Sequence, residues 1–167
     1  MKTKIIIAIV LFTLNTILCF GQERVSLSIL QDVKLATIGD KDHGYDAFTL
    51  DVIARVKMQG NQQKYGYMVV FPEFEYAQLK QDYMRYSANV GYTFNKLIVK
   101  NFDASLVGGF GFINREGEGS SSFSLTGEIG YSLNDWLKLV VDAQLVQRSD
   151  IEKYVTSGFL GIEIKIF

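Results

Sequence analysis

The chain has few of the residues that support enzyme chemistry or rigid turns. Its 167 residues include one proline, one cysteine, one histidine and one tryptophan, and the formal net charge is −1. A nearly neutral chain has no basic field to attract nucleic acid, so no nucleic-acid partner is expected. Beyond residue 21, no apolar run reaches the roughly 18 residues that a membrane helix needs. Any insertion into a membrane must therefore use strands.

Residues 1–21 are predicted to form a secretory signal peptide. Two lysines give it a charged start, an apolar core runs to Leu18, and Cys19-Phe20-Gly21 offers small residues for cleavage before residue 22. An uncleaved anchor and a lipoprotein acylated on Cys19 are the alternatives. Leu18 disfavours the lipoprotein, because Gly, Ala or Ser usually precedes the acylated cysteine. Cleavage leaves a chain without cysteine, and hence without disulfides.

Residues 22–167 are predicted to form one all-β domain, an up-and-down antiparallel transmembrane β-barrel of about eight strands. From Tyr154 to Ile166 the even positions are mostly apolar and the odd positions mostly polar, as in a strand with one apolar face. Similar alternation recurs in seven earlier segments, at residues 25–37, 48–58, 65–71, 86–94, 102–112, 123–133 and 137–145. Strands of about this length suit an eight-stranded membrane barrel. The longer connections are expected at residues 38–45, 72–84, 115–121 and 147–153.

Aromatic side chains are expected to form two girdles at the membrane–water interfaces, with aliphatic residues between them. The girdle at the periplasmic rim is predicted to contain Tyr65, Tyr67, Tyr92, Phe94, Phe102, Tyr131, Trp136 and Phe167. The girdle at the opposite rim is predicted to contain Phe48, Phe71, Tyr86, Phe110, Phe112, Phe123 and Tyr154.

The polar face of the strands is predicted to line a narrow interior. It is rich in serine and glycine, which suit the lumen of an eight-stranded barrel. Its charges nearly cancel, and buried charges must be paired. We therefore expect an interior ion-pair network, and the alternative is an ordinary solvated face. The expected members are Asp32, Lys34, Asp51, Arg55, Lys57, Asp103, Glu128, Lys138, Asp142, Glu163 and Lys165.

With these features, residues 22–167 resemble the small eight-stranded outer-membrane barrels of the OmpA transmembrane-domain and OmpX kind. The resemblance rests on the signal peptide, the repeated amphipathic strands, the girdles and the terminal Phe167. In that family the terminal Phe usually faces the lipid, whereas here Ile166 occupies the lipid-facing position. It implies export to the outer membrane of a Gram-negative bacterium, contact with outer-membrane lipid, recognition by the barrel-assembly machinery and a monomeric state.

The sequence offers little evidence of a reaction, so the chain is not expected to be an enzyme or to use a cofactor or metal. His43 lies beside Asp40, Asp42 and Asp46, which would serve a surface metal site or half of a hydrolytic pair. A plain polar loop is the favoured interpretation, because these acids lack the spacing of a calcium loop and no serine can be placed beside His43.

The expected role is structural, or surface interaction through extracellular loops, above all residues 38–45 and 72–84. Alternation through Phe74-Glu75-Tyr76 suggests an exposed strand edge, to which a partner could add a strand. A general porin is not expected, because a barrel of eight usually encloses side chains. The alternatives are a lipid-modifying enzyme that uses His43, a soluble secreted barrel with an apolar ligand inside, and a narrow pore.

Overall fold

The computed structural model describes residues 24–39, 44, 46–78, 83–95, 101–115, 117–148 and 153–166. The predicted signal peptide, His43 and Phe167 lie outside these residues. In the described part of the chain, no helix is long and apolar enough to cross a membrane.

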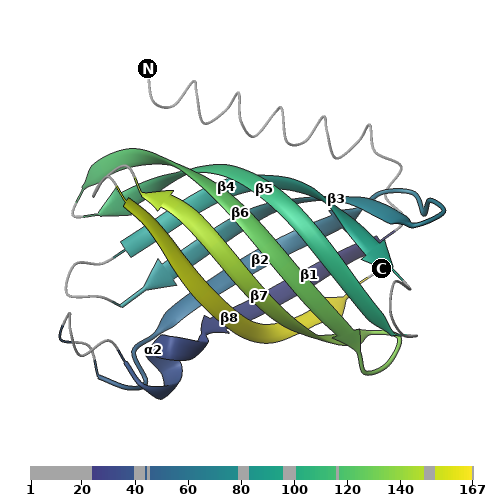
Figure 1. Ribbon diagram of the computed structural model, residues 1–167, viewed down its shortest axis with the longest axis horizontal. Coiled ribbons are helices and arrows are strands. Elements are labelled where there is room, and N and C mark those ends of the chain that lie inside the picture. The colour runs from purple at the N-terminus through teal and green to yellow at the C-terminus, as the bar shows by residue number, and fades with distance from the viewer. Residues whose placement is uncertain are drawn as a thin grey trace.

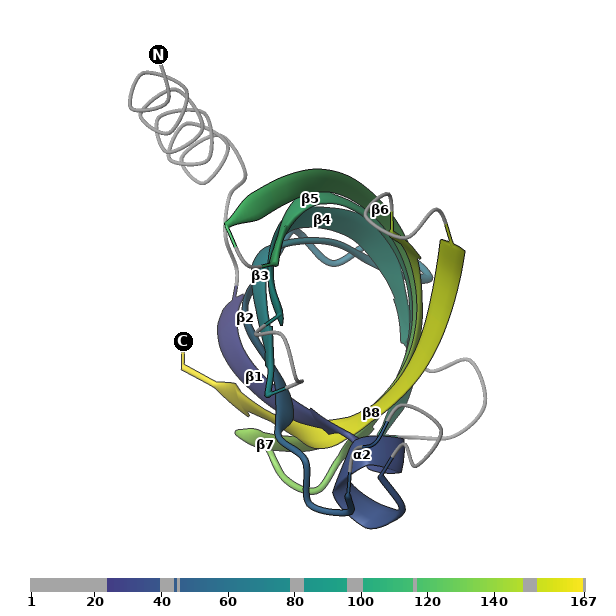
Figure 2. The ribbon, with the colours of Figure 1, turned by 90° about the vertical axis from the view of Figure 1, so that its left-hand side faces the viewer.

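Eight antiparallel strands close into one barrel (Figure 1). Each strand pairs with its neighbours in sequence, and β1 pairs with β8 to complete the ring seen along the barrel in Figure 2. The prediction of an all-β, up-and-down barrel of about eight strands is confirmed. The elements are β1 (Arg24–Asp32), α2 (Val33–Thr37), β2 (Asp51–Gln59), β3 (Gly66–Ala77), β4 (Tyr83–Asn95), β5 (Phe102–Arg115), β6 (Glu118–Ser132), β7 (Leu137–Arg148) and β8 (Lys153–Lys165).

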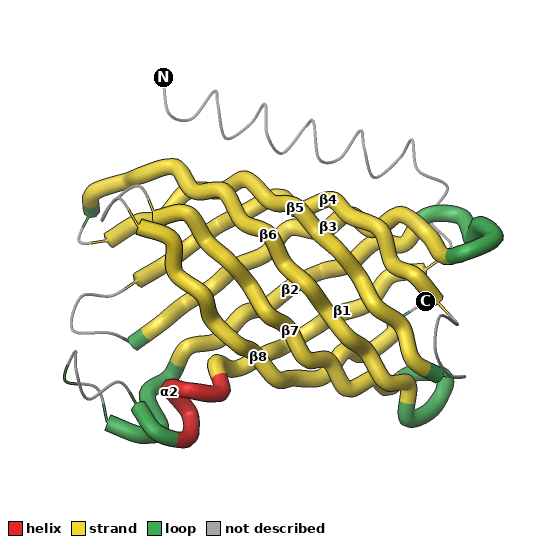
Figure 3. The backbone as a smooth tube through the Cα atoms, viewed as in Figure 1, coloured by secondary structure: helices red, strands yellow, loops and turns green. Residues whose placement is uncertain are grey.

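The two ends of the barrel carry different connections (Figure 3). One end, here called the α2 end, holds the β1–β2 connection with α2 and the connections after β3, β5 and β7. The other, the termini end, holds the start of β1, the end of β8 and the connections after β2, β4 and β6. The β1–β2 connection is the longest, because it runs from residue 33 to residue 50.

Two of the expected long loops are wrong. The segment 72–84 is mostly strand, since β3 continues to Ala77 and β4 begins at Tyr83. The segment 115–121 is a tight hairpin, in which Arg115 pairs with Glu118. Gly117 has a φ of 86°, a left-handed conformation that glycine adopts without strain. A loop was expected at 72–84 because Pro72 interrupts the third strand, and at 115–121 because that segment is hydrophilic, but Glu73 and Glu75 continue the alternation of β3. The exposed strand edge expected at residues 74–76 is also wrong, because this part of β3 pairs with both β2 and β4.

The strands alternate between an apolar outward face and an inward face that holds the charged and polar side chains together with a few apolar clusters. Outward side chains such as Leu106, Ile129 and Val141 are exposed, at 56%, 56% and 52%. Inward side chains such as Ser26 and Glu163 are fully buried, at 0%. The barrel therefore has the inside-out arrangement that distinguishes a membrane barrel from a water-soluble one.

The helix α2 replaces the end of the first predicted strand, which was expected to run to Thr37. The strand ends at Asp32, whose Oδ1 accepts a hydrogen bond of 2.7 Å from the backbone N–H of Leu35 and so caps the helix. The last β1–β8 pair is Asp32–Phe159, so residues 153–158 of β8 extend beyond β1. Because α2 contacts β8 (Figure 2), it covers the strand edge that this stagger leaves open.

Candidate functional site

Charged side chains from seven of the eight strands fill the interior of the barrel. They point inward because they occupy the inward phase of each strand. Their neighbours on that face are serine, threonine and other polar residues, together with three apolar clusters that contain Ile53, Phe71 and Ile113. The basic members are Arg55, Lys57, Arg85 and Lys138, and the acidic members are Glu73, Glu75, Asp103, Glu128, Asp142 and Glu163. We call this set the interior network.

Arg55 on β2 joins three other strands. Its Nε lies 2.6 Å from Glu73 Oε2 on β3, and its Nη1 lies 3.3 Å from Glu128 Oε2 on β6. Nη1 also contacts Asp142 Oδ2 on β7. The Arg55 side chain is 0% exposed, and its Cζ lies 5.3 Å from the centre of the Phe71 ring. A planar guanidinium with several donors is suited to such a hub.

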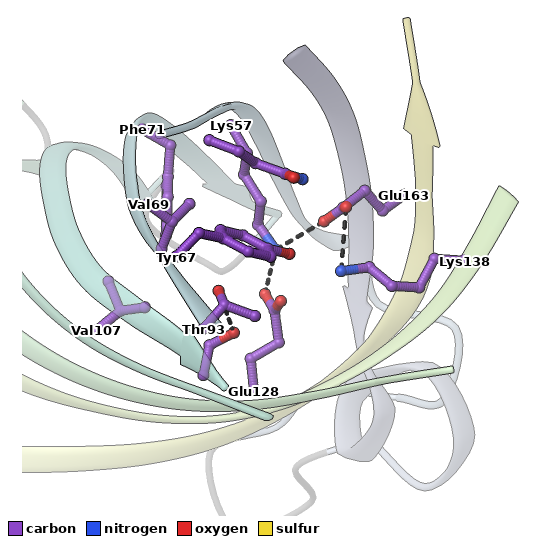
Figure 4. A pocket seen from close by; sticks show the side chains of 11 residues that line it. Lys57, Tyr67, Val69, Phe71, Thr93, Val107, Glu128, Lys138 and Glu163 are labelled. Carbon is purple, nitrogen blue, oxygen red and sulfur yellow. Dashed lines mark hydrogen bonds and ion pairs between the residues drawn. The ribbon is translucent and has the colours of Figure 1, made fainter. Parts of the chain in front are cut away.

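Two lysines share one carboxylate on the side of the lumen nearer the termini (Figure 4). Glu163 on β8 lies 2.9 Å from Lys57 Nζ through one oxygen and 3.1 Å from Lys138 Nζ through the other. Lys57 also contacts Glu128, and Lys138 lies 3.3 Å from Asp103 Oδ2. Ion pairs therefore link β2, β5, β6, β7 and β8 across the lumen.

Arg85 on β4 is the basic member of the network nearest the α2 end. Its Nη1 lies 2.7 Å from Glu73 Oε1 and 3.5 Å from Glu75 Oε2. Its Nε and Nη2 donate hydrogen bonds of 3.1 Å and 2.7 Å to the hydroxyls of Ser122 and Ser124 on β6. Since Glu73 contacts both Arg85 and Arg55, one carboxylate connects the two arginines.

Little free volume remains beside this network. The space bounded by Lys57, Tyr67, Glu128 and Lys138 measures about 10 Å³ (Figure 4). A cavity of that size holds about one water molecule. At this level the side chains of the described residues fill most of the lumen.

Seven residues of the predicted network come together in the lumen, namely Arg55, Lys57, Asp103, Glu128, Lys138, Asp142 and Glu163. The other four lie elsewhere. Asp32 caps α2, and Lys34 is exposed on that helix because the strand has already ended. Asp51 is buried at the α2 end, but among the described residues it forms no ion pair. Lys165 is half-buried at the termini end.

Glu73, Glu75 and Arg85 are members that the sequence reasoning missed, because it placed Glu73 and Glu75 in the connection at 72–84 and began the next strand after Arg85. The same reasoning gave β3 the wrong phase. Tyr67 lines the interior and Phe71 is 1% exposed, so the prediction that both face the membrane interface is wrong. Apolar residues occupy both faces of β3 up to Phe71, so the sequence pattern does not show which face meets the lipid. The alternation of Glu73 and Glu75 with neighbouring apolar residues was the signal that could have revealed the phase.

Most of the remaining aromatic residues project outward near the two ends. Those toward the termini end are Tyr65, Tyr92, Phe94, Phe102, Tyr131 and Trp136. Those toward the α2 end are Tyr86, Phe110, Phe112, Phe123 and Tyr154, together with Phe74, which the sequence reasoning left in a loop. Several pack in pairs, with ring centres 4.8 Å apart for Phe102 and Tyr131 and 5.0 Å apart for Phe110 and Phe123.

Phe48 differs from the other girdle residues, because it was expected in a strand and lies in a turn before β2. Its φ is 68° and its side chain is 90% exposed. A backbone with this φ is not extended, so Phe48 cannot be part of a strand, and the left-handed conformation is unfavourable for a bulky residue.

No group of three or more His, Cys, Asp or Glu residues suited to a metal ion occurs among the described residues. The expected alternative site at His43 lies outside them.

Comparison with known proteins gives a match of fold. No protein-family model and no curated protein matches the chain. Among solved structures, the outer membrane protein Ail of Yersinia pestis, determined in a phospholipid bilayer nanodisc, is similar with a TM-score of 0.55. The match covers 86% of this chain and 99% of Ail, at 13% sequence identity. The likeness shows that the chain has the closed eight-stranded fold of a small outer-membrane barrel.

Proposed function

We propose that the chain is an outer-membrane β-barrel protein of a Gram-negative bacterium, exported through a cleaved signal peptide. An outward face of exposed Leu, Ile and Val, bordered by aromatic residues at both ends, suits a bilayer. The fold likeness to Ail supports the same location. The α2 end is assigned to the cell exterior because it carries the longest connection, and such barrels usually have short periplasmic turns.

The buried interior network carries the functional part of the proposal. A general porin needs a water-filled lumen, whereas here ion pairs from Arg55 to Glu128 and from Lys57 to Glu163 cross it. The role is therefore structural, or interaction at the outer rim, and conduction is not part of it. The β1–β2 connection is the best surface for a partner, because Ile38 and Phe48 stand 67% and 90% exposed there.

Two measurements test the closed membrane barrel. Protein extracted from the outer-membrane fraction should migrate differently in a gel when it is boiled. In planar bilayers the purified barrel should give no steady conductance, with a general porin in the same bilayer as the positive control. Steady single-channel steps from the wild-type chain would contradict a filled lumen and favour the narrow pore.

The surface role is tested by photo-crosslinking in living cells. A photoreactive residue at Phe48 is compared with one at Val56, which lies in the middle of the outward face of β2. A protein adduct at position 48, absent at position 56 and sensitive to protease added outside the cell, would support a surface partner. If position 48 forms adducts with lipid alone, the surface-partner role is contradicted and the structural role remains.

Two other functions receive less support. A soluble barrel that binds an apolar ligand would need an apolar interior, but Arg55, Arg85 and Glu163 occupy it. A lipid-modifying enzyme would depend on His43, so a His43→Ala variant that alters the lipid A of the cell would revive that alternative.

A further inference from the structure

A groove at the termini end contains two basic side chains that take no part in the interior network. It has a volume of about 380 Å³ and is lined by Arg24, Asp135, Trp136, Lys165 and Ile166. Within the described part of the chain, neither Arg24 nor Lys165 has a carboxylate within ion-pair distance, whereas the four basic residues of the interior network are all paired. The groove therefore holds two cations and one carboxylate, Asp135, that form no ion pair with one another.

Backbone hydrogen bonds hold the walls of the groove in place. The N–H of Lys165 donates to Trp136 O at 2.9 Å, and the N–H of Ile166 donates to Val25 O at 2.8 Å. The turn that carries Trp136 is closed by Asn134, whose Oδ1 accepts from the N–H of Trp136 at 3.0 Å. The end of β8 is thus fixed between β1 and the β6–β7 turn. A ligand would meet a preformed site, which lowers the entropy cost of binding.

The groove also connects the outward wall of the barrel with its mouth. Ile166 follows the outward phase of Ile162 and Ile164, while Lys165 follows the inward phase of Glu163. Trp136 and Ile166 are 55% and 50% exposed, so both present apolar surface beside the charges. A molecule with acyl chains along the barrel wall could place a polar head among Arg24, Lys165 and Asp135.

We propose that this groove binds the phosphoethanolamine headgroup of a zwitterionic phospholipid from the adjoining leaflet. Guanidinium and ammonium groups suit the phosphate, so Arg24 and Lys165 bind it. Asp135 supplies the carboxylate for the lipid ammonium. Trp136 and Ile166 contact the glycerol and the first methylenes, as interfacial aromatic and aliphatic residues do. The inference rests on the proposed insertion into the outer membrane, and it is independent of any surface partner.

The test uses the full chain extracted from outer membranes in a detergent without phosphate, with bound phospholipid measured by native mass spectrometry. The wild type should retain one phosphatidylethanolamine as lipid is added. The double variant R24Q/K165Q should bind it about 25-fold more weakly, at about fivefold for each cation removed. The control is K64Q, because Lys64 is an exposed lysine in the turn between β2 and β3, at the same end but outside the groove. That variant should bind like the wild type.

Two further comparisons identify the chemical group that the groove binds. The wild type should prefer phosphatidylethanolamine over phosphatidylglycerol, and D135N should lose this preference while it keeps phosphate binding. Excess inorganic phosphate should not displace the lipid. Trp136 is the only tryptophan, so quenching of its fluorescence by brominated phosphatidylethanolamine reports occupancy directly.

Three results would overturn the proposal: equal lipid binding by the wild type and R24Q/K165Q, an equal loss in K64Q, or displacement by inorganic phosphate. Equal binding of the two lipids by the wild type would overturn the assignment of Asp135. Gel mobility before and after boiling is recorded for every sample. If the wild-type protein shows the mobility shift but retains no lipid, the lipid site in the groove is contradicted and the membrane barrel is not. If the wild-type protein shows no mobility shift, the proposed membrane barrel itself is contradicted.

Discussion

Replacing Glu73 by Gln should destabilise the barrel strongly, because this carboxylate neutralises two buried arginines. Its Oε2 lies 2.6 Å from Arg55 Nε and its Oε1 lies 2.7 Å from Arg85 Nη1. Arg55 would keep Glu128 and Asp142, but Glu75, at 3.5 Å, would be the one carboxylate left to Arg85 among the described residues. Removing one partner of a buried ion pair costs about 3–5 kcal/mol. Since Gln retains one acceptor, we expect a loss of about 3 kcal/mol, which is roughly a hundredfold in the folding equilibrium.

The assay is urea unfolding of the chain refolded into phospholipid vesicles. Fluorescence of Trp136 and the fraction of the heat-modifiable gel band report the folded barrel independently. A lower urea midpoint with an unchanged slope indicates lost stability without a change in exposed surface. Glu118→Gln is the matched control, because Glu118 is exposed at the start of β6 and the same change should shift stability by no more than about 0.5 kcal/mol.

A midpoint for Glu73→Gln equal to that of the Glu118→Gln control would refute the buried-pair reasoning. A double-mutant cycle makes the test specific. Glu73→Gln combined with Arg85→Gln should show a coupling energy of about 1 kcal/mol or more, since the two side chains are in contact. Strict additivity would mean that the contact contributes nothing.

Three further changes test the packing around glycines, the contact of an aromatic ring with Arg55, and the screening of the ion pairs by salt. Each is measured by the urea midpoint. A Cβ on Gly111 would lie 2.3 Å from Tyr86 O, so Gly111→Ala should cost about 1–3 kcal/mol, whereas Gly108→Ala meets nothing within 4 Å and should be nearly neutral. Phe71→Leu removes the ring that lies 5.3 Å from Arg55 Cζ and should cost about 1–2 kcal/mol. Raising sodium chloride from about 0.05 M to about 1 M should barely move the wild-type midpoint, because buried pairs are weakly screened; a large drop would indicate exposed pairs.

The barrel could be predicted from the sequence because the outward phase is apolar in nearly every strand. Leu125, Ile129 and their equivalents repeat at every second residue, and only a strand gives that period. The prediction was wrong where this contrast disappears. In β3 both faces are apolar up to Phe71, so the phase was reversed there. At Val33–Thr37 the residues also alternate, yet the Asp32 cap favours a helix.

The membership of the interior network could be predicted better than its pairing. An inward charge is recognised from its own strand, as for Lys138 or Glu163, and needs no knowledge of other strands. Which acid meets which base depends on barrel closure, which places Arg55 of β2 beside Asp142 of β7, 87 residues away. The groove at the termini end was not foreseen for the same reason, since its walls come from β1, the β6–β7 turn and the end of β8.

The interior network also explains how strands with similar outward faces can find one register. A slip by one residue would expose charges to lipid, but a slip by two residues keeps the phase and leaves Leu, Ile and Val equally well placed outside. Such a slip moves each side chain by about 6.6 Å along its neighbour. Asp142 would then lose Arg55, and Glu163 would lose contact with Lys57 or Lys138. Because Arg55, Lys57 and Lys138 each meet acids from at least two strands, the charges distinguish registers that the apolar face cannot, and the same contacts fill the lumen.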